Sequence, residues 1–366
     1  MTTAAIRVPF NVLRPGEDRA AIEAAIARVL DSGWFVLGPE VAAFESEFAA
    51  AAGARHAVGV NTGTDAIALA LRGLGIGPGD EVITSPLSAA YSALAIDMTG
   101  ARPVFADLDP ARLTLDPRAV AAAVTPRTRA VLPVHLYGQA ADMDGIAAVA
   151  AAHRLAVVED ACQAHGATVA GRPVGRGSAA AAFSFYPTKN LGALGDGGAV
   201  TTDDPALAER VRRLRNGGQS SRYHHDETGV NSRLDELQAA ILRARLPRLA
   251  AATAARRRLA ARYRSALAGA AVTVPAEHDP GHVYHLFPVL TGERDRFQAH
   301  LAAHGIETLV HYPVPIPRQP AARSWSPAPC PLANEVCDRV VSLPLYPSLA
   351  DGAQDDVVRA VLAFSR

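Results

Sequence analysis

The stretch AAAFSFYPTKNLGALGDGGA, residues 180–199, joins an apolar run to a glycine-rich turn, and Lys189 lies between them. Lys and Arg together number 36, yet Lys189 is the only lysine in the chain. An arginine can replace a lysine as a surface charge, but its guanidinium stays protonated, whereas a lysine amine can lose its proton and attack a carbonyl carbon. The single lysine therefore indicates covalent chemistry. The alternative is a surface lysine that escaped a bias toward arginine and alanine.

Length and charge limit what else the chain does. At 366 residues and 38.2 kDa it exceeds one ordinary core, which predicts one large domain and a smaller one. Lys plus Arg and Asp plus Glu are balanced at 36 each. This balance argues against nucleic acid or an anionic membrane surface as a partner, because both require an excess of basic residues.

The cysteines and the N-terminus bear on compartment. Cys162, Cys330 and Cys337 form no CxxC pair, which fits a reducing compartment and gives no sign of a metal site. The start, MTTAAIRVPF, lacks a basic segment followed by an apolar core, and no run of 18 apolar residues follows. We therefore expect a cytoplasmic protein without a membrane partner.

Short apolar runs alternate with helical patterns through the first two thirds of the chain. Residues 17–51 predict two helices separated by the loop SGWFVLGPE. The predicted strands are 56–60, 81–84, 103–106, 129–134, 155–159, AAAFSF and GGAVTT, and the helices between them are 64–74, 88–99 and 142–152. Such alternation indicates an α/β fold, in which helices flank a mostly parallel sheet.

The last third has a different pattern. A helix from Pro205 to Arg215 and a polar loop precede an Arg-rich and Ala-rich helical stretch at 232–267, which Pro247 should kink or divide. A strand pattern at 283–290, a helix at 293–304, a Pro-rich loop at 313–331 and a final helix predict a smaller C-terminal α+β domain. We expect residues 1–245 to form an N-terminal arm and the large domain, and residues 246–366 to form the small domain.

Thr62, Gly63 and Thr64 turn the chain from a predicted strand into a predicted helix. Small residues with free backbone amides at a helix start can form a phosphate cradle. A threonine N-cap is also how an ordinary strand–helix unit begins, so this signal alone is weak.

Asp160 follows an apolar strand, and Gln163 comes three residues later. A carboxylate at the carboxyl end of a parallel strand faces the ligand-binding crevice, where it could pair with the protonated ring nitrogen of a pyridoxal cofactor. Gln163 could then bond near the phenolic oxygen. The competing interpretation is a capping box of the Asp-x-x-Gln kind.

Around the lysine itself, Ser184 could add a hydroxyl to the phosphate site, and Tyr186 would line the pocket. Further along, Asn231 precedes a helix in GVNSRLDELQAA. By itself, an asparagine in this position is typical of a turn.

Together these strings resemble the DegT/DnrJ/EryC1/StrS family of nucleotide-sugar aminotransferases, within the fold type I group of pyridoxal phosphate enzymes. The resemblance runs through SGWFVLGPEV, NTGTDAIALAL, GDEVI, PVFADLDP, VLPVHLYGQ, VVEDACQAHGA, SFYPTKNLGALGDGGAV, LRNGGQ, GVNSRLDELQAA and HYPVP. It therefore covers nearly the whole chain. It implies pyridoxal 5'-phosphate as the cofactor.

The resemblance also implies catalytic roles by position. Lys189 falls on the family's Schiff-base lysine, Asp160 on the partner of the pyridine nitrogen, and Gln163 on the residue near the phenolic oxygen. The lysine amine would then act as general acid and base in the proton shift between donor and cofactor.

The phosphate site is implied in the same way. Gly63, Thr64 and Ser184 fall on the phosphate cradle, beside Thr62. Asn231 falls on a residue that reaches the phosphate from the neighbouring subunit, so the resemblance implies a homodimer with shared active sites.

One position departs from the family pattern. Where the family places an aromatic ring to stack on the pyridine, the string TSPLSAAYSALAI has Ala89, with Tyr91 two positions later. Either Tyr91 or another aromatic supplies the stacking contact, or the cofactor lies against apolar side chains.

The resemblance implies glutamate as amino donor and a nucleotide-linked keto-sugar as acceptor. GWFVLGPE, LRNGGQ, RYHH and HYP look like members that aminate C3 of dTDP-linked 3-keto-6-deoxyhexoses. Tyr186, His311 and Tyr312 are the candidates for the sugar pocket. For the last two, the alternative is a proline-braced loop at the domain junction.

Other functions use the same core residues. A C4 aminotransferase on UDP- or dTDP-4-keto-sugars and a keto-inositol aminotransferase remain open alternatives. A pyridoxal-dependent sugar dehydratase of this fold typically has histidine at the lysine position, so Lys189 disfavours it. A non-enzymatic pyridoxal-binding regulator would need a fused DNA-binding segment, and the sequence shows no helix-turn-helix extension.

Overall fold

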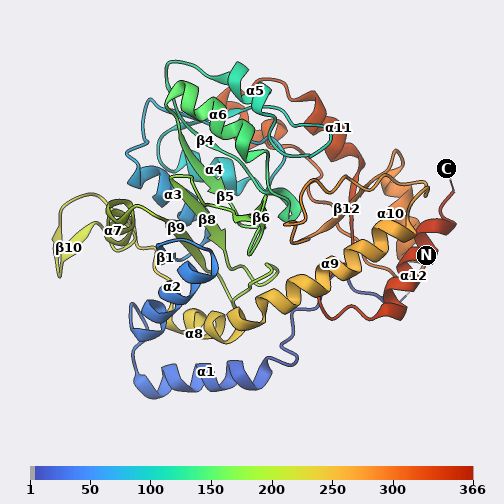
Figure 1. Cartoon of the computed structure of the whole chain (residues 1–366), viewed down its shortest axis with the longest axis horizontal. Helices are drawn as coiled ribbons and strands as arrows, with labels where there is room; N and C mark the ends of the chain where they lie inside the picture. The colour runs from blue at the N-terminus through green and yellow to red at the C-terminus, as the bar shows by residue number, and fades with distance from the viewer. Residues whose placement is uncertain (1–4, 366) are drawn as a thin grey trace.

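A seven-stranded sheet forms the centre of the computed structural model, which describes residues 5–365 (Figure 1). Its strand order is β1-β9-β8-β5-β4-β2-β3. The strands are β1 (His56–Val60), β2 (Glu81–Thr84), β3 (Arg102–Phe105), β4 (Thr128–Leu132), β5 (Ala156–Asp160), β8 (Ala180–Ser184) and β9 (Gly198–Thr202). β9 is antiparallel to both its neighbours, and the other pairs are parallel. The predicted mostly parallel sheet is therefore confirmed.

Helices cover both faces of this sheet. One face carries α3 (Gly63–Gly73), α4 (Tyr91–Asp97) and α7 (Pro205–Leu214), and the other carries α2 (Pro39–Ala51), α5 (Pro117–Ala123), α6 (Met143–His153) and α8 (Glu236–Arg245). Alternate residues of a strand enter different cores: Val58 packs with α3, whereas Ala57 packs with α2. Because both faces are buried, the strands are continuous apolar runs in the sequence.

The loop between α1 (Arg19–Ser32) and α2 is fixed from α8. The buried carboxylate of Glu236 accepts hydrogen bonds from the amides of Gly38, Glu40 and Val41, each at 2.8 Å. These amides belong to the start of α2, where a carboxylate satisfies free donors. The preceding aromatic residues, Trp34 and Phe35, are left exposed.

Pro247 divides the long Arg-rich stretch, as predicted. α8 ends at Arg245, a 3-10 turn follows at η2 (Leu246–Arg248), and α9 (Leu249–Ala266) then runs from the sheet to the C-terminal elements (Figure 1). There β12 (Phe287–Leu290) and β13 (Val340–Leu343) pair antiparallel, with α10 (Arg294–Ala303), α11 (Pro331–Arg339) and α12 (Asp351–Ala363) around them. The domain boundary at residue 245 stays a prediction.

The N-terminal segment lies against these C-terminal elements. Its backbone pairs with residues 305–307, through the amides of Arg7 and Val8 on the Gly305 carbonyl and the amide of Glu307 on the Val8 carbonyl. The remaining short elements are β6 (Thr168–Val169), β7 (Arg172–Pro173), β10 (Gln219–Ser221), β11 (His224–His225), η1 (Leu136–Gly138), η3 (Ile316–Arg318) and η4 (Pro320–Trp325). Among residues 5–365, no helix is both long enough and apolar enough to span a membrane.

Short elements are where the sequence prediction was wrong. The strand expected at 283–290 is limited to β12, and the Pro-rich loop contains η3 and η4. The helices α5 and α11 and the strand β13 were not predicted. α5 begins at Pro117 after the Asp116 cap, a clear start signal, but its seven residues are too few to show a helical period.

Candidate active site

A cavity of about 570 Å³ lies where β5 and β8 end and α3 begins. The carboxyl ends of parallel strands are the usual ligand-binding edge of such sheets. We call it the cofactor cavity, and its lining is Thr62, Gly63, Thr64, Ile67, Ser88, Ala89, Tyr91, Ser92, Val134, Asp160, Cys162, Gln163, Ser184, Tyr186, Lys189, Asp196 and Tyr312. The predicted site residues meet here, with the exceptions of Asn231 and His311.

Lys189 lies in a tight turn after β8. Gly192 closes this turn so tightly that a Cβ there would lie 2.6 Å from the carbonyl oxygen of Pro187. Burial lowers the pKa of the Lys189 amine below its ordinary value, although the thiol of Cys162 and the carboxylate of Asp160 act in the opposite direction. A lowered pKa increases the neutral fraction, which is the nucleophilic form.

Asp160 ends β5 and is only 5% exposed. Its Oδ2 accepts a 2.6 Å hydrogen bond from the Ser92 hydroxyl, and its Oδ1 accepts one from the Cys162 amide at 3.1 Å. Ser92 in turn lies 3.0 Å from the Ser88 hydroxyl. The carboxylate makes no ion pair with any described residue. A buried carboxylate held by neutral donors alone fits a cationic ligand group such as a pyridinium.

Gln163 connects the cavity to two other segments. Its Oε1 accepts from the Tyr137 amide at 2.7 Å, and its Nε2 donates to the Tyr312 hydroxyl at 3.1 Å. Burial raises the pKa of Tyr312 to about 12, so this hydroxyl stays protonated at neutral pH. The capping-box alternative for Gln163 is not what the structure shows, because its side chain bonds across the fold.

The N-terminus of α3 supplies the expected cradle. Thr62 is the N-cap, and its hydroxyl accepts from the Asp65 amide at 3.0 Å, leaving the amides of Gly63 and Thr64 at the cavity. A Cβ on Gly63 would lie 2.6 Å from Cβ of Ser184, so only glycine allows this close approach. Amides at the start of an eleven-residue helix favour an anion such as phosphate.

The residues therefore fit pyridoxal phosphate. Lys189 offers the amine, Asp160 offers an unpaired carboxylate, and the start of α3 offers amides for a phosphate, all around one cavity. The cofactor would therefore bind in this cavity without a rearrangement of the fold.

The position expected to stack on the pyridine face holds an alanine, as the sequence indicates. Ala89 lines the cavity and brings no ring, whereas Tyr91 also lines it and is 63% exposed. Tyr186 is half exposed at the same cavity. Tyr91 as a stacking partner stays a prediction.

Two predicted residues lie outside the cavity lining. The His311 ring bonds through Nδ1 to the Ser342 hydroxyl at 3.0 Å and stacks on Phe10, while its carbonyl accepts from the Tyr137 hydroxyl. Asn231 is exposed and bridges to Asn216 by backbone pairing. Its expected role belongs to a neighbouring subunit, so a single chain leaves that prediction open.

The sequence analysis missed the polar residues that support Asp160. Ser92 lies in α4, and Ser88 precedes that helix in the loop after β2. Their contact therefore depends on the fold of this loop and not on helical spacing. Cys162 and Asp196 also line the cavity without having been proposed. Nothing in the sequence distinguishes them from ordinary turn residues.

Fold and site together define a pyridoxal-phosphate-dependent transferase of fold type I. The chain belongs to the DegT/DnrJ/EryC1/StrS aminotransferase family, whose model matches residues 17–362. It is thus an aminotransferase that depends on pyridoxal phosphate.

Similar proteins narrow the comparison further. The chain is 54% identical over 352 residues to the dTDP-3-amino-3,4,6-trideoxy-alpha-D-glucose transaminase of Streptomyces venezuelae, covering 94% of this chain and 92% of that protein. It is 45% identical to the UDP-N-acetyl-3-dehydro-alpha-D-glucosamine 3-aminotransferase of Acidithiobacillus ferrooxidans, covering 91% and 90%. The crystal structure of S. venezuelae DesV with a ketimine intermediate superposes with a TM-score of 0.95 at 52% identity, covering 98% of both chains.

Proposed function

We propose that this chain transfers the amino group of glutamate to C3 of a dTDP-linked 3-keto-6-deoxyhexose. The observation that carries the proposal is the meeting of Lys189, the only lysine, with the unpaired carboxylate of Asp160 and the amides of α3 in one cavity. The 54% identical transaminase, which is named for a dTDP-3-amino sugar, supports the choice of acceptor.

Asp160, Ser92 and Lys189 have different roles in the proposed reaction. Asp160 would keep the ring nitrogen of a bound cofactor protonated, and Ser92 holds the carboxylate in place. The Lys189 amine, with its lowered pKa, would act as general base for the proton on the donor carbon and then as general acid for the same proton. When bound, pyridoxal phosphate supplies the electron sink for the negative charge that develops in between.

For the acceptor sugar, we propose Tyr186 and Tyr312 as contacts at the cavity and His311 as a supporting residue. The hydroxyl of Tyr312 already bonds to Gln163, so it stands at the inner end, while Tyr186 is half exposed. Burial and the charge of Lys189 lower the pKa of His311 to about 4, so its imidazole is neutral at pH 7.

We also propose a homodimer with shared active sites. The chain exposes several large aromatic residues, Trp34, Phe35, Tyr91 and Tyr186, and Asn231 is exposed as well. Large exposed apolar side chains of this kind mark interaction surfaces. Light scattering of the purified protein checks the assembly, since a monomer at micromolar concentration would contradict it.

The test of the function is turnover of a panel of dTDP- and UDP-linked 3-keto and 4-keto sugars with glutamate, with the products assigned by NMR. The proposal is supported if a dTDP-3-keto-6-deoxyhexose has the highest kcat/KM of the panel and is aminated at C3. Preference for a 4-keto sugar of the panel, or for a keto-inositol assayed beside it, would replace it.

A UDP-linked 3-keto sugar is the second candidate acceptor. The relative from A. ferrooxidans is 45% identical and is named for a UDP sugar. The same panel separates the two, because it pairs each 3-keto sugar with either nucleotide.

A further inference from the structure

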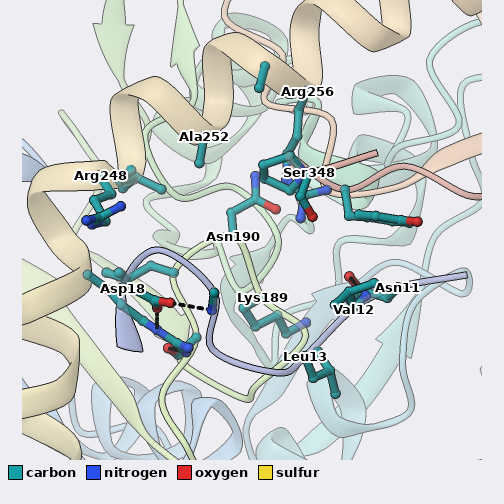
Figure 2. A pocket seen from close by; sticks show the side chains of 18 of the residues that line it. Asn11, Val12, Leu13, Asp18, Lys189, Asn190, Arg248, Ala252, Arg256 and Ser348 are labelled. Carbon is teal, nitrogen blue, oxygen red and sulfur yellow. Dashed lines mark hydrogen bonds and ion pairs between the residues drawn. The ribbon is translucent and has the colours of Figure 1, made fainter. Parts of the chain in front are cut away.

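A second cavity, of about 510 Å³, lies beside Lys189 along α9, and we call it the α9 cavity (Figure 2). Three segments far apart in sequence enclose it with α9: residues 11–18, residues 187–192 and residues 346–348. Lys189 is the one lining residue that it has in common with the cofactor cavity. A ligand in the α9 cavity would therefore lie next to the reacting amine without occupying the cofactor's place.

Arg256 of α9 brings a buried positive charge to this cavity. It is 5% exposed, and its Nη1 donates to the carbonyls of Tyr284, His285 and Leu345 at 2.8 to 3.3 Å. Its Nε is buried without a hydrogen-bond partner, and its Nη2 makes no hydrogen bond to the described residues 5–365. Figure 2 shows the side chain extending from α9 toward Asn190 and Ser348.

No carboxylate of the described residues neutralises this guanidinium. The acidic residues at the cavity are already engaged or solvated: Asp18 bonds to Arg245 at 2.8 Å, and the highly exposed Glu17 lies 3.5 Å from Arg248. Burial without a counter-ion lowers the pKa of Arg256 to about 10, so it remains protonated at neutral pH. A buried unpaired cation is costly, and a bound anion would offset that cost.

The other groups at the cavity suit a small carboxylate. The Ser348 hydroxyl is exposed and free of partners among the described residues, and it lies at the same end as Arg256 (Figure 2). Ala251, Ala252 and Ala255 form an apolar wall between this end and Arg248. A guanidinium with a hydroxyl beside it matches one carboxylate group, and an alanine wall matches a short methylene chain.

We propose that the α9 cavity binds a carboxylate of the amino donor, with Arg256 as its counter-ion. This inference rests on the proposed function, because an aminotransferase must admit an amino acid as well as the keto-sugar to the same lysine. The chemistry favours a dicarboxylic amino acid over a nucleoside diphosphate, because Arg256 is the one buried arginine of the lining. Arg245 and Arg248 already pair with Asp18 and Glu17, and Arg14 is exposed.

The test fills the cavity without disturbing Arg256, whose bonds to three carbonyls also support the fold. Ala252→Leu places a larger side chain on the wall of the α9 cavity, and Ala254→Leu, on the exposed side of the same helix, is the matched control. Leucine is a good helix former, so neither change should unfold α9.

In Ala252→Leu we expect KM for glutamate to rise at least about ten-fold, which is the effect of losing a charged hydrogen bond. KM for the keto-sugar should stay unchanged in this variant. In the control variant, both KM values should equal those of the parent protein. Calorimetric titration of the holoenzyme with glutarate, which has both carboxylates but no amine, gives a readout apart from activity. Glutarate should bind the parent protein and Ala254→Leu, and its affinity for Ala252→Leu should fall by the same factor.

Two results would overturn the inference. Equal glutarate affinity in all three proteins would mean that the α9 cavity does not hold the donor. Loss of dTDP binding in Ala252→Leu, with glutarate unaffected, would assign the cavity to the nucleotide instead. Failure of every keto-sugar in the panel, with glutarate binding intact, would refute the proposed function and leave the carboxylate site standing.

Discussion

The cofactor cavity and the α9 cavity meet at Lys189 but carry opposite buried charges. In the cofactor cavity, the unpaired group is the carboxylate of Asp160, held by the Ser92 hydroxyl and the Cys162 amide. In the α9 cavity it is the guanidinium of Arg256, held by backbone carbonyls. Both groups are 5% exposed, and neither has a counter-ion among the described residues.

This difference teaches how to infer the ligand of each cavity. A buried charge costs several kcal/mol unless an opposite charge or a good set of hydrogen bonds offsets it, so each group indicates the sign of its ligand. Asp160 indicates a cation, such as a protonated pyridine, and Arg256 indicates an anion, such as a carboxylate. Lys189 lines both cavities, so under the proposal its amine lies next to both the cofactor and the donor.

Lys189→Arg is expected to have the largest effect. Because a guanidinium stays protonated, it cannot attack the cofactor or shuttle the proton, and kcat should fall on the order of 10⁴-fold or more. Borohydride reduction followed by mass spectrometry should find no cofactor covalently attached to the variant. Trapping that persists would contradict the scheme, because no second lysine side chain exists in this sequence.

Asp160→Asn removes the charge from the cofactor cavity and should lower kcat by roughly 10²- to 10⁴-fold, through loss of the protonated ring nitrogen. Without cofactor, the variant should unfold at the same temperature as the parent or higher, because an uncompensated buried carboxylate has been removed. Calorimetry of both forms measures this.

The matched control is Asp144→Asn, at a largely exposed carboxylate away from both cavities, which should change neither quantity. A cofactor-free Asp160→Asn protein that is clearly less stable than the parent would contradict the comparison. It would mean that the carboxylate is stabilising before any cation arrives.

Ser92→Ala tests the support of that carboxylate and should have a smaller effect. Loss of the 2.6 Å hydrogen bond to Asp160 should weaken cofactor binding and kcat by about ten-fold, and Ser92→Thr should restore both. Ser88→Ala removes only the outer hydroxyl of the pair and should cost less.

Absorbance of the bound cofactor as a function of pH distinguishes a positioning role of Ser92 from a purely structural one. If Ser92 orients Asp160, the titration midpoint of the cofactor should move in Ser92→Ala and return in Ser92→Thr. An unmoved midpoint with lower stability would assign Ser92 a packing role only.

The sequence predicted more of the cofactor cavity than of the α9 cavity. Lys189 was evident from its uniqueness and Asp160 from its place after a strand, because the parallel sheet brings strand ends together whatever the loops do. The bond from Ser92 to Asp160 spans 68 residues and needs the packed fold. Arg256 belongs to a run of three arginines, and only the structure shows that it is buried whereas Arg258 pairs with Asp351 at the surface.

The smallest effect is predicted for His165, a buried residue near Lys189. Its ring is fully buried against Phe183 and Phe185, and neither nitrogen has hydrogen-bond geometry to a described residue. Burial and the positive charge of Lys189 hold the pKa of His165 at about 3, and the carbonyl of Ser184 offsets only part of this.

His165 should therefore make the protein sensitive to acid. Between pH 6.5 and 3 the unfolded chain binds a proton that the folded protein refuses, so the free energy of unfolding falls as the pH falls through this window. His165→Leu, of similar volume, removes that proton and should move the midpoint of acid unfolding down by about half a pH unit. His153→Leu, at an exposed histidine, is the control and should leave the midpoint in place. A His165→Leu midpoint equal to the parent's would mean that the folded protein accommodates an imidazolium beside Lys189, and hence that the surroundings of His165 are more polar than its contacts indicate.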